Sequence, residues 1–144
     1  MQQATYDNIK ATNITTLLSV TALLETGIGI GLLAVPSLVT QVLLGTTLDT
    51  PASLSVARVA GAALLTIAIA CWLARYDAQS CAARGIVSAM VFYNLGAAVI
   101  LAAAGIQSKL TGIGLWPAVI LHAVMTIWCV SQLLGKQSRE ERAS

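Results

Sequence analysis

Four long hydrophobic stretches, separated by short polar segments, make up most of this chain. A helix needs about 20 predominantly apolar residues to cross a bilayer, because the hydrocarbon core is about 30 Å thick. The pattern therefore predicts membrane spans at residues 14–35, 53–73, 86–104 and 115–134, followed by a polar tail at 136–144. The first apolar run is longer than the roughly 7–15 residues typical of a cleaved signal peptide, so we interpret it as a retained helix.

Prolines mark two boundaries within this pattern. Pro36 lacks a backbone donor and ends the first span. Between Pro36 and Gly45 polar residues recur on one helical face and apolar residues on the other, which predicts a short helix lying in the membrane interface. Thr50 followed by Pro51 is typical of the first turn of a helix and starts the second span.

The composition agrees with a membrane location. Hydrophobic residues make up 57% and charged residues 10% of the sequence, against about 25% charged residues in soluble domains. A chain of 144 residues has room for four crossings and short loops, so we predict a single all-α transmembrane domain, a four-helix bundle. The scattered charges form no basic patch for nucleic acid, and the lipid bilayer is the expected partner.

The positive charges predict an orientation. Of the eight Lys and Arg residues, Lys109 alone falls in a loop on the far side, and Arg58 lies within a span. The others are in the termini and in the loop between the second and third spans. Because cytoplasmic loops carry an excess of Lys and Arg, both termini are expected in the cytoplasm of a bacterial-type inner membrane.

Helix packing is expected to rely on small residues, because lipid gives no hydrophobic drive for helices to associate. Gly27 and Gly31 form a G-x-x-x-G pair in the first span, and Gly61 follows Ala57 at the same spacing in the second. Such small residues either pack the four helices together within one chain, or Gly27 and Gly31 join two copies as a homodimer.

Four polar residues interrupt the spans: Glu25, Arg58, Asn94 and His122. An ionised side chain near the middle of a bilayer costs at least about 2.5–3.5 kcal/mol, so such groups face protein or trapped water. Our preferred arrangement is an ion pair between Glu25 and Arg58 that fixes helix register. Two alternatives remain: a binding or transport pocket lined by all four residues, or an Arg58 that reaches the outer headgroups beside a protonated Glu25.

The sequence offers little for catalysis. It has no metal-type cluster of His, Cys, Asp and Glu, and no nucleophile with a base nearby in sequence. A single histidine cannot supply two axial haem ligands. We therefore predict no enzyme activity, no metal and no cofactor.

The first half of the chain resembles a group of small, uncharacterised four-helix bacterial inner-membrane proteins, with an architecture loosely similar to DoxX-like proteins. The resemblance is carried by the glycine-rich first helix, the Pro-led segment 36–45 and the second helix with Arg58-Val59-Ala60-Gly61. It implies an architecture and a buried arginine, and no chemistry. The first functional hypothesis is a non-catalytic accessory or assembly subunit that docks on other membrane subunits. The second is a small carrier for an anionic or proton-coupled solute, with Arg58 as anion contact and Glu25 as proton site.

Overall fold

The computed structural model describes the backbone of residues 2–143 and the side-chain surroundings of residues 11–134. It contains five α-helices and one short 3₁₀ helix, in the order α1 (Gln2–Ala34), α2 (Pro36–Leu44), α3 (Pro51–Ala74), η1 (Arg75–Asp77), α4 (Cys81–Gln107) and α5 (Leu115–Ala143). Four segments are long and apolar enough to cross a membrane: Ala11–Ala34, Pro51–Asp77, Cys81–Gln107 and Leu115–Leu134. The predicted fold class, an all-α protein with four spanning helices and a short helix between the first two, is confirmed.

The predicted helix boundaries around α2 and α3 follow from local chemistry. Pro36 opens α2, and Gly45 closes it in the left-handed conformation with its N–H bonded to the Gln41 carbonyl. At the start of α3 the Thr50 side chain accepts from the Ser53 N–H while the Ser53 hydroxyl accepts from the Thr50 N–H. This reciprocal pair satisfies two donors that a helix start would otherwise leave free.

Two helix starts and two helix ends differ from the predicted spans. α1 begins at Gln2 rather than at residue 14, and α4 begins at Cys81 rather than at residue 86. The third spanning helix continues past residue 104 to Gln107, and the chain takes its positive φ of 51° at Lys109. The last helix continues through Gly135 to Ala143, so residues 136–143 are helical rather than an irregular tail. One glycine costs only about 1 kcal/mol relative to alanine inside a helix, which the surrounding turns can offset.

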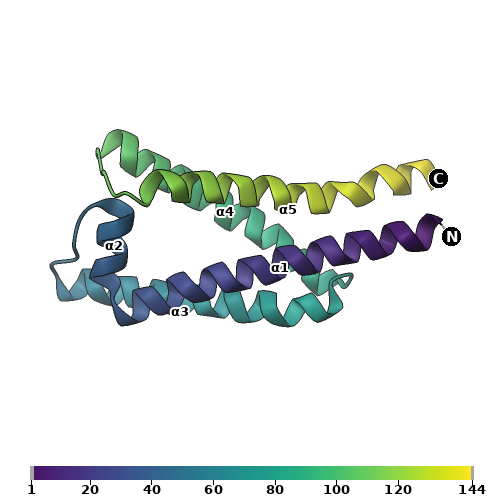
Figure 1. The fold of residues 1–144 in the computed structure, drawn as a ribbon. Coiled ribbons are helices and arrows are strands. Elements are labelled where there is room, and N and C mark those ends of the chain that lie inside the picture. The colour runs from purple at the N-terminus through teal and green to yellow at the C-terminus, as the bar shows by residue number, and fades with distance from the viewer. Residues whose placement is uncertain (1, 144) are drawn as a thin grey trace.

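The spanning helices form two antiparallel pairs. α1 makes most of its contacts with α3, and α4 makes most of its contacts with α5, whereas contacts between the pairs are fewer. Figure 1 shows α4 running diagonally away from the end of α3, so the pairs diverge toward the side where α2 lies. The beginning of α1 and the end of α5 lie at the same end of the molecule, as an even number of crossings requires.

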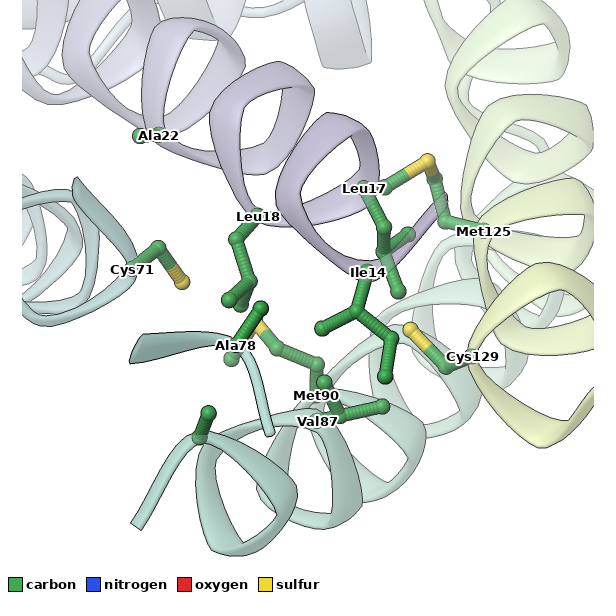
Figure 2. Packing of buried hydrophobic residues seen from close by; sticks show 11 residues of the cluster. Ile14, Leu17, Leu18, Ala22, Cys71, Ala78, Val87, Met90, Met125 and Cys129 are labelled. Atoms are coloured by element: carbon green, nitrogen blue, oxygen red, sulfur yellow. The ribbon is translucent and has the colours of Figure 1, made fainter. Parts of the chain in front are cut away.

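One apolar cluster joins the pairs in the half nearer the chain ends. Leu17 and Leu18 of α1, Val87 of α4 and Cys129 of α5 are each at most 1% exposed and meet there (Figure 2). At the opposite end α2 runs across the direction of the long helices (Figure 1), and the Gly114 N–H before α5 donates to the Val42 carbonyl over 2.9 Å. The two pairs are thus tied together at both ends.

The closest helix contact uses Gly29 and Gly61. A Cβ placed on Gly29 would lie 2.9 Å from the Gly61 carbonyl oxygen, and one placed on Gly61 would lie 2.8 Å from the Gly29 carbonyl oxygen. Only glycine at both positions allows α1 and α3 to approach so closely. Gly61 therefore packs within the chain, while Gly27 faces away from this contact with open space around it and Gly31 lies against Val39.

Candidate functional site

Glu25 is buried on the inward face of α1, with 7% of its surface exposed. Its Oε2 accepts a hydrogen bond from the Tyr93 hydroxyl of α4 over 3.2 Å. This bond joins the two helix pairs, because α1 belongs to one and α4 to the other. It lies beyond the apolar cluster, farther from the chain ends than Leu17 and Leu18.

Asn94 and His122 form the second polar contact, between α4 and α5. The Asn94 Nδ2 donates to the Met90 carbonyl one turn earlier over 2.8 Å, so its Oδ1 faces His122. The distance from this oxygen to His122 Nδ1 is 2.8 Å. Since an amide oxygen only accepts, His122 carries a proton on Nδ1 and donates it to Asn94.

An aromatic contact joins the two hydrogen-bonded pairs. The Tyr93 and His122 rings meet edge to face, with centroids 5.7 Å apart and planes at 83°. This is one of the preferred arrangements for neighbouring rings. We call Glu25, Tyr93, Asn94 and His122 the polar cluster.

Arg58 lies outside the polar cluster, and the predicted ion pair with Glu25 is not formed. Arg58 is exposed on α3, and the hydrogen bond shown for Glu25 comes from Tyr93. The reason is the Gly29–Gly61 crossing. Glu25 precedes Gly29 by four residues and Arg58 precedes Gly61 by three.

Because the helices are antiparallel, those offsets point in opposite directions and separate Glu25 from Arg58 by about 10 Å along the helix axes. Both side chains also lean toward the N-terminus of their own helix, which widens the gap. Arg58 lies instead nearer the N-terminal end of α3, on the side of the α2–α3 loop. From there its long side chain can extend to lipid headgroups. Of the four predicted site residues, Glu25, Asn94 and His122 are therefore brought together and Arg58 is not.

Tyr93 is the member that sequence reasoning missed. Tyrosines in membrane proteins concentrate at the two interfaces, where the ring is apolar and the hydroxyl is wet. Tyr93 instead stands near the middle of the 27-residue helix α4, directly before Asn94. A tyrosine at mid-span needs a partner for its hydroxyl, and that signal was present in the sequence.

Thr21 adds an unsatisfied hydroxyl near the polar cluster. It is 2% exposed, and its Oγ1 has no hydrogen-bond partner. The hydroxyls of Ser19 and Thr26 on the same helix donate to the carbonyls four residues earlier, at 2.8 and 2.7 Å. Thr21 does not, and it precedes Glu25 by one turn on the same buried face of α1.

Within the described part of the chain, no three His, Cys, Asp or Glu side chains are placed to hold a metal ion. Cys71 and Cys129 are free and buried, and Cys81 is free and exposed. No known protein family, curated protein or solved structure matches this chain.

Proposed function

We propose that this protein is a non-catalytic accessory or assembly subunit of a membrane complex. The observation that carries the proposal is that three glycines of the described spans have no neighbouring helix packed against the position of a Cβ atom. A Cβ placed on Gly27, Gly85 or Gly96 would meet no atom within 4 Å. In lipid, helices associate through such small residues because they let backbones approach closely.

The chain's own packing shows how such glycines are used. Gly29 and Gly61 make the α1–α3 crossing, and Gly105 lies against Leu115 and Trp116. Gly27, Gly85 and Gly96 have no such neighbour, so they offer backbone surface to helices of another subunit. The polar cluster supports a structural role as well, because its hydrogen bonds and ring contact join α1, α4 and α5 to one another.

The setting we propose is the bacterial inner membrane, with both termini in the cytoplasm. The excess of Lys and Arg in the termini and in the α3–α4 connection supports this orientation. The bacterial inner membrane is further supported by the resemblance to small four-helix bacterial membrane proteins of loosely DoxX-like architecture. That resemblance is itself part of the proposal.

A proton-coupled carrier is the second candidate, and one observation favours it. The unpartnered Thr21 hydroxyl beside the buried Glu25 is the kind of intramembrane polar site at which transporters bind ions. The anionic-solute form of this hypothesis loses support, because Arg58 is exposed and apart from Glu25. Proton coupling at Glu25 is the part that the geometry favours.

The accessory role is tested by purifying the protein from its native membrane in mild detergent, as wild type and as Gly27→Leu and Gly96→Leu. Ala63→Leu is the control, since Ala63 is an exposed small residue on α3. We expect wild type and Ala63→Leu to co-purify in fixed proportion with at least one other membrane protein, and at least one glycine variant to lose it. A wild-type protein that runs alone, or a complex that survives both glycine variants, would contradict the proposal.

A second measurement separates the two candidates. The purified protein alone is reconstituted in vesicles, and internal pH is followed with a dye after an external pH step. Proton flux above that of empty vesicles, lost in Glu25→Gln, would support the carrier in place of the subunit.

A further inference from the structure

Glu25 has no cationic partner among the described side chains packed around it. The titratable groups facing it are Cys71 of α3 and Tyr93 of α4, and α2 has none. His122 of α5 meets the Tyr93 ring and the Asn94 amide, with no contact to Glu25 shown. The charged residues of η1 lie farther away. The Arg75 carbonyl accepts from Thr15, ten residues before Glu25 and so about 15 Å along α1.

An ionised Glu25 would therefore be a buried charge without a counter-ion. Such a group tends to become neutral by binding a proton, because the cost of burying the unpaired charge is far larger than the cost of burying the acid. Arg58, the basic residue of the neighbouring helix α3, lies on the far side of the Gly29–Gly61 crossing. The geometry thus leaves a proton as the simplest means of neutralisation.

The hydrogen bond from Tyr93 uses one oxygen of the Glu25 carboxyl group. The Tyr93 hydroxyl donates to Glu25 Oε2 over 3.2 Å. In a carboxylic acid one oxygen accepts hydrogen bonds while the other carries the proton. The Tyr93 bond is therefore compatible with a protonated Glu25 whose O–H is on the oxygen that Tyr93 does not contact.

Thr21 supplies what a protonated Glu25 requires. A carboxylic acid has one O–H donor, which needs an acceptor when it is buried. Thr21 Oγ1 is buried, has no partner, and belongs to the residue one turn before Glu25 on the same face. The two side chains make no direct hydrogen bond in the structure. Side chains four apart on a helix have Cβ atoms about 5–6 Å apart, so one bridging water or a change of the Glu25 rotamer would connect the acid O–H to Thr21 Oγ1.

We propose that Thr21, Glu25 and Tyr93 form an intramembrane proton-binding site, in which a proton from the aqueous phase binds one Glu25 carboxylate oxygen and is donated to Thr21 Oγ1, while the Tyr93 hydroxyl donates to the other oxygen. A sodium ion is the competing ligand. Hard cations generally take about six oxygen ligands, and this site offers two hydroxyls and one carboxylate. The inference stands whether the protein is an accessory subunit or a carrier.

The test is infrared spectroscopy of the whole protein in lipid vesicles at neutral pH. We expect a carbonyl stretching band of a protonated carboxyl group that is absent in Glu25→Gln, which keeps the size of the side chain. Thr21→Val and Tyr93→Phe should each shift this band to higher frequency, because each removes a hydrogen bond, and Thr21→Ser should restore the wild-type position. Thr26→Val is the control, since the Thr26 hydroxyl is bonded to the Ala22 carbonyl and should leave the band unchanged.

Three results would overturn the proposal. The first is a carboxylate band, without the protonated band, for Glu25 in the wild type. The second is a protonated band at the same frequency in the wild type, Thr21→Val and Thr21→Ser, which would exclude Thr21 from the site. The third is loss of the protonated band on adding sodium chloride at constant pH, which would assign the site to the cation. None of these depends on a partner protein, so failure here is distinguishable from failure of the accessory role.

Discussion

At the residue scale, the Asn94–His122 contact ties α4 to α5 through a polar bond inside an apolar environment. The Asn94 amide is oriented by its bond to the Met90 carbonyl, so its oxygen is aimed at His122 before the helices meet. Interhelical hydrogen bonds of this kind contribute about 0.6 kcal/mol on average in membranes, and at most about 1.7. The contact therefore specifies which faces of α4 and α5 pack together, with a modest gain in stability.

A double-mutant cycle measures this bond. Asn94→Ala and His122→Ala, alone and together, are compared in reversible unfolding from mixed micelles, and we expect a coupling free energy of about 1 kcal/mol. The control cycle pairs Asn94→Ala with Arg58→Gln, an exposed residue outside the polar cluster, and should give coupling below about 0.5 kcal/mol. Equal coupling in the two cycles would contradict the role assigned to the Asn94–His122 bond.

Three of the four residues of the polar cluster could be predicted from the sequence. Glu25, Asn94 and His122 could be singled out because polar groups in a span are costly, and they do meet. Arg58 was paired with Glu25 because each charge would otherwise lack a partner in the bilayer. The height of a side chain relative to a helix crossing depends on where the partner helix crosses, which the sequence of one helix does not show. Tyr93 was not predicted because tyrosine is common in membrane helices near the interfaces, and burying its hydroxyl costs less than burying a charge.

At the element scale, the crossing of α1 and α3 depends on two facing glycines. Gly61→Ala puts a methyl group where the Gly29 carbonyl oxygen lies 2.8 Å from the Cβ position, so the helices must move apart. We expect a loss of about 1–3 kcal/mol in the free energy of unfolding, the usual range for overpacking. Unfolding of the purified protein in mixed micelles measures it.

Gly27→Ala is the matched control for that variant. It adds the same methyl group to the same helix pair, yet no atom lies within 4 Å of the new Cβ. Because alanine is the better helix former, we expect stability unchanged or raised by up to about 1 kcal/mol. A Gly27→Ala protein destabilised as much as Gly61→Ala would contradict this account, because neither helix propensity nor a contact with the Gly29–Gly61 crossing explains a loss at Gly27.

The existence of the helices and the boundaries around α2 and at the start of α3 could be read from the sequence, whereas the starts of α1 and α4 and the ends of α4 and α5 could not. Pro36, Gly45 and the Thr50–Pro51 pair impose local geometry, so their roles follow from the residue types alone. Gly105 and Gly135 are followed by residues that can continue a helix, and the helices do continue past them. A glycine ends a helix only when the next residues prefer another conformation.

At the scale of the whole molecule, two antiparallel helix pairs meet at an apolar cluster near the chain ends, at the polar cluster beyond it, and at α2 on the opposite side (Figure 1). The number of spans could be predicted from hydropathy, since it needs only segment length. The pairing of α1 with α3 and of α4 with α5, and the thin contact between the pairs, depend on which small and polar residues face one another across helices.

The native cysteines offer the most direct test of the central claim. That claim is that four helices cross a membrane, with the α2–α3 connection on one side and the α3–α4 connection on the other. Cys81 is exposed at the start of α4, and Thr47 is exposed between α2 and α3, while Cys71 and Cys129 are 0% exposed. Sealed vesicles of known orientation are treated with a membrane-impermeant maleimide, using wild type for Cys81 and Thr47→Cys in a Cys81→Ser background. We predict that Cys81 reacts only from the cytoplasmic side, that the cysteine at position 47 reacts only from the other side, and that Cys71 and Cys129 stay unlabelled until the protein is denatured. Labelling of positions 47 and 81 from the same side would contradict the four-span fold.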